Sequence, residues 1–443
     1  MELLIKNDIE IVNPTPYVLN WCEENLVIDN PDYIIANRLG RYVGRMEKKL
    51  QLYVRNGDRL LVPYGCLKKI WSISKGATFQ CLFPIFKGNK MQGHISLYDY
   101  QEKALKMLLR GKNGVLEAPC GSGKTQIGLQ FIKEVGGKAL WLTHTKKLLT
   151  QSKERAETYF EGDFGTITDG KVNIGKDITF ATVQTMRALD PKVYANEFDI
   201  VVVDECHHCV GTPTKVMQFY QVLTNLNCRY KLGLSATLTR SDKMTKCIFH
   251  IIGEKLHTIT EQEVGSKIIK AKHVKVEVLE DYPIESYCQP DGMIDFGKMV
   301  TLLSQDERRN GIICAQVMHY HKMGKKQLVL CLRLDQIDYL KKLFSQYGLK
   351  VNVITGRVKQ KERDYGGDVI IATYAIAKEG LDIPLLDVVH FTMPQKDKSI
   401  VKQSAGRVER NYVGKPQPLV IDYVDMNIPY CLKAFEVRRR ILK

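Results

Sequence analysis

The run APCGSGKT at residues 118–125 stands between a short strand-like run at residues 114–117 and a helical pattern over residues 126–134. Glycines between a strand and a helix allow backbone amides and the helix N-terminus to surround a polyphosphate. Ala118 occupies the position where the first glycine of such a loop is usual. The run therefore predicts a nucleotide-binding loop. Its expected phosphate-lining residues are Cys120, Gly121, Ser122, Gly123, Lys124 and Thr125.

Within this loop, Lys124 is expected to neutralise the β- and γ-phosphates, and Thr125 is expected to hold Mg²⁺. A second signal is the run FDIVVVDECH at residues 198–207. Its continuous apolar part indicates a buried parallel strand that ends in Asp204 and Glu205. Sheets of α/β proteins place their ligands at the carboxyl ends of such strands. Asp204 is therefore expected to help hold the Mg²⁺ ion, and Glu205 is expected to polarise the attacking water.

Length and charge limit the class of protein. A chain of 443 residues is too long for one hydrophobic core and predicts two or three domains. Its 65 lysines and arginines exceed its 49 aspartates and glutamates, which favours a polyanionic partner through counterion release. No apolar run is long enough to cross a bilayer, and residues 1–14 carry no signal-peptide pattern. We therefore expect a cytoplasmic protein with no membrane partner.

Residues 1–95 carry short alternating runs at residues 50–54 and 59–62, joined across Asn56-Gly57, which predicts a β-hairpin. Basic residues outnumber acidic ones there, so we expect a small, mainly β accessory domain that binds nucleic acid. The aromatic residues of this region are equally consistent with stacking on bases and with packing in a core. These residues are Tyr33, Tyr42, Tyr53, Tyr64 and Trp71.

From residue 96 the chain alternates strand-like and helical patterns, which is typical of α/β domains with parallel sheets. We expect one such domain at residues 96–258, a polar, irregular linker at residues 259–290, and a second domain at residues 291–443. The expected strands of the first domain are residues 114–118, 139–143, 178–182, 199–203 and 231–235. Those of the second are residues 327–331, 351–354, 369–372, 388–392 and 418–423.

Short motifs accompany these strands in a fixed order. They are LYDYQ (97–101), THT (143–145), TVQT (182–185), LSATLTR (234–240), AT (372–373), EGLD (379–382) and QSAGRVER (403–410). Together with the loop and the acidic run, this series resembles superfamily 2 helicases with an Asp-Glu-x-His motif. The run LGLSATLTRSD (232–242) and the DERRN run (306–310) are most similar to the XPB-like branch and to branch-migration and annealing helicases of tailed phages.

The resemblance implies two RecA-like domains that use ATP and Mg²⁺. Gln101 matches the glutamine that reads the adenine edge, to which a planar amide is suited. Gln403 matches the residue that senses the γ-phosphate. Arg407 and Arg410 match the arginines that reach this phosphate from the second domain, a contact of the arginine-finger kind.

Further roles follow from the same resemblance. Gly380 matches a glycine that permits close backbone approach, and Asp382 matches a carboxylate that contacts the ribose or the arginines. His207 and the turn Ser235, Ala236 and Thr237 resemble the relay between the ATP site and the nucleic-acid track. Strand-end hydroxyls and amides are expected to grip phosphodiesters without reading bases, although a strand-end threonine is as often an ordinary cap. These residues are Thr143, Thr182, Gln184, Thr355 and Thr373.

The resemblance implies a DNA helicase or translocase that moves 3′ to 5′ on single-stranded and branched DNA such as forks, D-loops and Holliday junctions. It implies a monomer that works with replication, recombination or repair proteins. Two alternatives stay open: an ATP-driven translocation or clamp subunit that separates no strands, and an RNA helicase. The run Ala434–Lys443 indicates a basic amphipathic helix that packs on the second domain with a solvated arginine face, or contacts DNA.

Overall fold

The computed structural model forms two compact units, Met1–Val264 and Gly265–Lys443, and each is described by itself. The boundary predicted at residue 95 lies inside the first unit, and the one predicted at residue 258 lies close to the end of that unit. The residues that the structure describes are 1–240, 242–264, 270–277, 283–358, 364–378, 383, 385–408 and 417–442. No helix among them is both long and apolar enough to cross a membrane.

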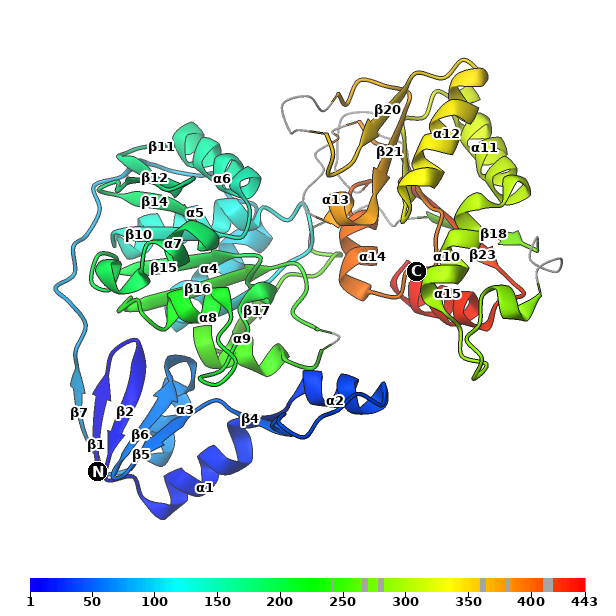
Figure 1. Ribbon diagram of the computed structural model, residues 1–443. Helices are drawn as coiled ribbons and strands as arrows, with labels where there is room; N and C mark the ends of the chain where they lie inside the picture. The colour runs from blue at the N-terminus through cyan, green and yellow to red at the C-terminus, as the bar shows by residue number, and fades with distance from the viewer. Residues whose placement is uncertain are drawn as a thin grey trace. The chain divides into compact units, whose positions relative to one another are not determined.

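The large sheet of the first unit has eight strands in the order β13-β12-β14-β10-β15-β16-β9-β17, all parallel to their neighbours except β13 (Figure 1). The strands are β9 Gly114–Glu117, β10 Ala139–Thr143, β12 Phe164–Thr168, β13 Lys171–Asn173, β14 Ile178–Thr182, β15 Ile200–Asp204, β16 Tyr230–Ser235 and β17 Lys255–Thr258. The five predicted strands are confirmed. Strands β12, β13 and β17 were missed because they are short, polar and at or near the sheet edges.

Helices cover both faces of this sheet, which explains why its central strands are apolar at every position. Trp141 packs in one core with α4 Asp99–Gly111, α5 Lys124–Val135 and α6 Lys146–Tyr159. The neighbouring Leu140 packs in the opposite core, whose helices are α7 Val183–Ala188, α8 Gln218–Leu223 and α9 Thr245–Ile252. Alternate side chains of one strand thus enter different cores.

Residues 1–81 form a five-stranded sheet in the order β5-β6-β2-β1-β7 beside a two-stranded pair, β3 and β4. The strands are β1 Glu2–Ile5, β2 Asp8–Val12, β3 Val27–Asp29, β4 Lys49–Gln51, β5 Val54–Asn56, β6 Arg59–Pro63 and β7 Thr78–Cys81. The helical elements are α1 Pro16–Asn25, α2 Pro31–Arg38, the 3-10 turn η1 Tyr64–Cys66 and α3 Leu67–Ile73. The predicted hairpin is β5–β6, but its first strand starts at Val54, because residues 49–51 pair with β3 instead.

This small sheet packs tightly on the base of the large one. A side-chain carbon placed on Gly65 would lie 2.1 Å from the carbonyl oxygen of Phe249 in α9, so only glycine allows this approach. The Tyr64 hydroxyl donates to the Arg229 carbonyl oxygen at 3.1 Å. Lys231, at the start of β16, donates from its ammonium to the Asn7 carbonyl oxygen at 3.1 Å and is almost fully buried.

Burial lowers the pKa of Lys231 to about 8, although Cys228 and Asp8 act in the opposite direction. An unfolded lysine titrates near ~10.4, so between about pH 8 and pH 10 the unfolded chain binds more protons than the folded one. The free energy of unfolding should therefore rise over this window, by up to about 3 kcal/mol from this group. Thermal melts of the wild type and Lys231→Met between pH 7.5 and 10 test this, because only the wild type should gain this increment. Parallel pH profiles would contradict it.

Asp199, just before β15, joins the segment after β7 to the large sheet. Its buried carboxylate accepts backbone N–H groups of Lys87 at 3.0 Å, Gly88 at 3.1 Å and Lys138 at 2.8 Å. Nearby, the Glu197 carboxylate pairs with the ammonium groups of Lys87 and Lys138. Asp199 and Glu197 thus fix the chain at the amino-terminal end of β15, whereas Asp204 lies at the carboxyl-terminal end of the same strand.

Asp199→Ala should lower the free energy of unfolding by about 2–4 kcal/mol, because three backbone donors lose their acceptor. Urea denaturation of the variant measures the loss. Asp169→Ala is the matched control, since Asp169 and its partner Lys146 are both exposed. Equal midpoints for the two variants would show that the Asp199 contacts contribute no more than a surface ion pair.

The second unit contains a six-stranded parallel sheet in the order β18-β23-β22-β19-β21-β20. Its strands are β18 Lys270–Val276, β19 Gln327–Cys331, β20 Val351–Ile354, β21 Val369–Thr373, β22 Val388–Phe391 and β23 Leu419–Asp425. Its helices are α10 Phe296–Gln305, α11 Glu307–Lys322, α12 Leu334–Gln346, α13 Tyr374–Lys378, α14 Lys398–Ala405 and α15 Pro429–Ile441. The five predicted strands are confirmed. The linker prediction is wrong at β18, a lysine-rich edge strand whose mostly exposed side chains hide the strand pattern.

Two buried ion pairs hold this unit together. Arg309 pairs with Asp425 at 2.8 Å, and Arg438 of α15 pairs with Asp422 at 2.8 Å. The prediction of a solvated arginine face is therefore wrong for Arg438, which is fully buried, although Arg439 and Arg440 are exposed. A buried carboxylate on the neighbouring strand makes burial of this arginine possible.

Candidate active site

The run at residues 118–125 connects β9 to α5, as predicted. Gly121 and Gly123 have φ angles of 81° and 79°, which side-chain-bearing residues rarely adopt. A side-chain carbon on Gly123 would also lie 2.2 Å from Nε2 of Gln101. The loop is thus shaped by glycine and leads directly into the N-terminus of α5, where backbone amides are available to an anion.

Lys124 is the first residue of α5, and its ammonium turns back over the loop. It donates to the carbonyl oxygens of Ala118 at 3.0 Å and Pro119 at 3.2 Å. Its positive charge acts on both Asp204 and Glu205. The lysine of the loop and the two acids after β15 therefore belong to one electrostatic site.

Asp204 and Glu205 end β15 with unusual backbone geometry. Glu205 has φ 53° and ψ 50°, a left-handed conformation that is strained for a residue with a side chain. Its backbone N–H donates to the Asp204 carboxylate at 3.0 Å. Backbone strain of this kind is concentrated at functional sites, which fits a chemical role for this acidic pair.

The protonation of His207 follows from its neighbours. Ser235 Oγ donates to the Thr237 carbonyl oxygen at 2.8 Å, so this hydroxyl accepts from His207 Nδ1 at 3.0 Å. Nδ1 therefore carries a proton, and it also lies 3.3 Å from the Glu205 carboxylate. His207 thus lies between Glu205 and the turn after β16, while the relay role itself stays a prediction.

The two acids have opposite pKa shifts. Burial and the adjacent Glu205 charge raise the pKa of Asp204 above its usual range. Burial also acts to raise the pKa of Glu205, but the His207 hydrogen bond and the Lys124 ammonium hold this pKa below its usual range. A carboxylate with a low pKa is a weak base. Glu205 is therefore suited to orienting and polarising water rather than to taking its proton fully.

Arg240 is a site residue to which the sequence alone gives no role. Its guanidinium donates to the His207 carbonyl oxygen and pairs with Asp242, with Nε 3.0 Å from a carboxylate oxygen. It thereby ties the segment after β16 to the segment after β15. The only signal in the sequence was an arginine and an aspartate two positions apart, which is too common to be diagnostic.

Gln101 lies against the loop instead of pointing outward. Its amide nitrogen donates to the Ser122 carbonyl oxygen at 2.8 Å, and its amide oxygen accepts the Tyr98 backbone N–H at 2.9 Å. It is 4% exposed, so both halves of its amide are used within the protein here. The predicted adenine contact remains a prediction, while Gln101 demonstrably fixes the loop to the start of α4.

The predicted track residues of the first unit lie together at the carboxyl ends of two paired strands. Thr143 and Thr182 are directly opposite in the β10–β14 register. Both are buried, and their hydroxyls donate within the protein, Thr143 to the Thr145 carbonyl oxygen at 3.1 Å and Thr182 to the Thr185 hydroxyl at 3.0 Å. Gln184 is exposed and donates to the His144 carbonyl oxygen at 2.9 Å. Gln184 is thus the accessible member of the set.

Histidines connect this strand edge to the acids. The ring centroids of His144 and His208 are 4.4 Å apart, and those of His208 and His207 are 4.2 Å apart. Nothing in the sequence spacing of His144 and His208 shows that the two strand ends meet. In the structure they form a continuous contact from the end of β10 to the partner of Glu205.

In the second unit, Thr355 follows β20 and Thr373 ends the neighbouring strand β21, and their hydroxyls accept local backbone N–H groups at 3.3 and 3.4 Å. Gln403 is buried in α14, and Arg407 donates to the Ala377 carbonyl oxygen at 3.0 Å. The predicted residues Gly380, Asp382 and Arg410 lie outside the described residues.

Family models match both units. Residues 94–240 match the model described as type III restriction enzyme, res subunit, and residues 308–412 match the helicase conserved C-terminal domain. Together these matches cover more than half of the chain. The chain belongs to the superfamily 2 helicases. It is an ATP-dependent enzyme, and the resemblance to XPB-like and phage helicases is confirmed, because its relatives include a translocase named XPB2 of Sulfurisphaera tokodaii and helicases of the phages T5 and T4.

The helicase is 28% identical to a putative ATP-dependent RNA helicase of Acanthamoeba polyphaga mimivirus, over 89% of this chain and 76% of the relative. It is 24% identical to the ATP-dependent DNA helicase uvsW of Enterobacteria phage T4, over 77% of this chain and 70% of the relative. Among solved structures, Dbp5 of S. cerevisiae bound to RNA and ADP BeF3 aligns with a TM-score of 0.55 and 15% identity, over 86% of this chain and 92% of Dbp5. The fold of tandem RecA-like domains is thus confirmed.

The residues present fit a magnesium nucleotide. Mg²⁺ prefers oxygen ligands and keeps several waters, so the Thr125 hydroxyl and the Asp204 carboxylate are a sufficient protein contribution alongside phosphate oxygens. The glycine loop provides backbone amides, and Lys124 provides the positive charge. Among the described residues there is no group of three or more histidines, cysteines or acids suited to another kind of metal site.

Proposed function

We propose that this helicase is a DNA helicase or translocase that moves 3′ to 5′ on branched DNA such as forks, D-loops and Holliday junctions, in replication, recombination or repair. The observation that carries this proposal is the connection from Glu205 through His207 to the strand edge of Thr143, Thr182 and Gln184. Such a path allows nucleic acid to influence hydrolysis. Several relatives are named as DNA enzymes, among them a DNA 3′-5′ translocase of Sulfurisphaera tokodaii and the DNA helicase uvsW of phage T4.

In this proposal the chain's own residues divide the work. Backbone amides of residues 120–123 and the Lys124 ammonium hold the phosphates, while Thr125 and Asp204 hold Mg²⁺. Bound Mg²⁺ supplies charge neutralisation at the phosphates. Glu205 orients the attacking water, with His207 fixing its carboxylate. Gln101, Gly380, Asp382, Gln403, Arg407 and Arg410 keep the nucleotide roles that the resemblance implies.

Two other functions have specific support. An RNA helicase is favoured by the mimiviral relative, which is named for RNA. A translocating subunit that separates no strands is favoured by the match of residues 94–240 to a restriction-enzyme subunit model. The net charge of +16 fits every one of these nucleic-acid partners and does not discriminate among them.

ATP turnover should be measured without nucleic acid and with single-stranded DNA, duplex DNA, a four-way junction and RNA, followed by strand separation on each stimulating substrate. We expect the strongest stimulation from branched DNA, with junction unwinding. Stimulation by duplex without strand separation would assign the translocating subunit instead. Stimulation by RNA alone would overturn the DNA proposal, and a 3′- or 5′-tailed substrate pair tests the direction of movement.

A further inference from the structure

Residues 30–49 form an excursion that we call the arm, which contains α2 and the chain leading to β4. Its base is closed by the β3–β4 pair and by hydrogen bonds from the Asn30 backbone N–H to the Lys48 carbonyl oxygen at 2.9 Å and from the Asn30 amide to the Glu47 carbonyl oxygen at 2.8 Å. Figure 1 shows α2 set apart from the five-stranded sheet of the same unit. The arm is therefore anchored at its base, while its tip packs on little of its own unit.

The arm exposes more apolar surface than its own folding explains. From Pro31 to Lys49 only Pro31 and Ala36 are buried. Its exposed large hydrophobic residues are Ile34 (43%), Ile35 (53%), Leu39 (55%), Tyr42 (83%) and Met46 (43%). Five large apolar side chains exposed within one short excursion are unfavourable in water, which suggests that the arm meets a partner.

Cations accompany these apolar residues. Five exposed cations, Arg38, Arg41, Arg45, Lys48 and Lys49, share the arm with only Asp32 and Glu47. The Asp32 carboxylate is already neutralised by Lys215 at 2.6 Å. None of the three arginines forms an ion pair with any residue that the structure describes. Their guanidinium groups thus present positive charge to a partner rather than to the protein.

We propose that the arm is a nucleic-acid contact, in which Arg38, Arg41 and Arg45 bind backbone phosphates and Tyr42 stacks on an unpaired base. Interleaved cations and exposed aromatic rings suit a strand with charged phosphates and flat bases. An acidic protein would satisfy the cations but would leave the stacking surface of Tyr42 unexplained. This inference rests on the proposed function. Within residues 1–81, it assigns the nucleic-acid contact to the arm and not to the five-stranded sheet.

The burial of two other aromatic residues of residues 1–95 supports placing the stacking contact on the arm. Tyr53 and Tyr64 are 8% and 4% exposed and belong to the core of the small sheet, so they are not available for stacking. Tyr42 is the most exposed of the five aromatic residues that the sequence singled out, at 83%. The Asp32–Lys215 ion pair also attaches the base of the arm to the segment between the 3-10 turn η3 Cys206–His208 and α8. A strand on the arm is therefore held by the same unit that carries the nucleotide loop.

The charge contribution is tested by the triple variant Arg38→Ala, Arg41→Ala, Arg45→Ala. Its dissociation constant for a forked DNA is measured by fluorescence anisotropy between about 50 and 200 mM salt. Three lost phosphate contacts should reduce the slope of log affinity against log salt by roughly 2–3. The control is Lys341→Ala, Lys342→Ala, Lys350→Ala, which removes the same charge from exposed positions in the second unit and should keep the wild-type slope.

The stacking contribution is tested by Tyr42→Ala. Affinity for a fork with single-stranded arms should fall roughly tenfold, while affinity for blunt duplex should not change. Tyr42→Phe should restore binding, and Tyr347→Ala, which removes another exposed ring, should have no effect. Melting curves of all variants should match the wild type, because the changed side chains are exposed.

The outcomes separate this inference from the proposed function. If the wild type shows DNA-stimulated turnover but the arm variants keep its slope and affinity, the arm inference fails and the proposed function stands. If the wild type itself shows no DNA-stimulated turnover, the proposed function fails. Binding of polyglutamate that depends on the arm, together with unchanged DNA binding, would assign the arm to an acidic protein and overturn the inference.

Discussion

Lys124→Ala should abolish ATP hydrolysis while leaving DNA binding intact. The Lys124 ammonium is placed over the nucleotide loop and acts on both acids, so its removal takes the main positive charge from the site. Loss of such a contact lowers turnover by on the order of 10²–10³-fold or more. A coupled ATPase assay measures turnover, and fluorescence anisotropy on the same preparation measures DNA affinity.

The matched control for this variant is Lys103→Ala. Lys103 lies in α4 of the same unit, is 66% exposed and pairs with Glu263 at the surface, so turnover should be unchanged. Wild-type turnover in Lys124→Ala would show that residues 118–125 are not the phosphate loop. Loss of DNA affinity together with turnover would instead indicate that the variant disturbs the fold.

Glu205→Gln should lower turnover by on the order of 10²–10⁴-fold while the nucleotide still binds. The substitution keeps the shape of the side chain and an oxygen beside His207 Nδ1, but it removes the negative charge that polarises water. Single-turnover hydrolysis and binding of a fluorescent ATP analogue separate the two effects. We expect weakened hydrolysis with nearly unchanged affinity.

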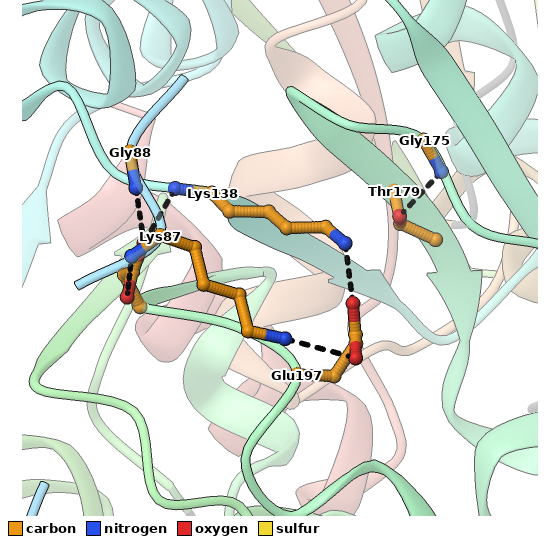
Figure 2. A network of polar contacts seen from close by, with 7 residues as sticks. Lys87, Gly88, Lys138, Gly175, Thr179 and Glu197 are labelled. Carbon is orange, nitrogen blue, oxygen red and sulfur yellow. Dashed lines mark hydrogen bonds and ion pairs between the residues drawn. The ribbon is translucent and has the colours of Figure 1, made fainter. Parts of the chain in front are cut away.

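Glu197→Gln is a suitable control, because this carboxylate lies at the opposite end of the sheet and pairs with Lys87 and Lys138 (Figure 2). Its turnover should equal that of the wild type. If Glu205→Gln hydrolyses ATP normally, the acid that orients water lies elsewhere. If it fails to bind nucleotide, Glu205 has a structural role in place of a chemical one.

The nucleotide loop and the two sheets could be predicted because their signals are local. Glycines at residues 121 and 123 permit a backbone that few other residues adopt, and buried central strands are continuous apolar runs. Because Asp204 and Glu205 follow such a run directly, they must lie where the carboxyl ends of the parallel strands meet. The strands at residues 139–143, 178–182, 327–331 and 351–354 were therefore predicted to the residue.

The sequence by itself thus determined the two α/β domains, the nucleotide loop and the acidic pair, because each depends on residues adjacent in the chain. Tertiary structure alone decided which polar and aromatic side chains are exposed. It buried Arg438 against Asp422, placed Tyr53 in a core and left Tyr42 on the arm. It also brought His144 to His208, which follow different strands. Burial and pairing depend on neighbours distant in sequence, and these neighbours are defined only when the sheets are assembled.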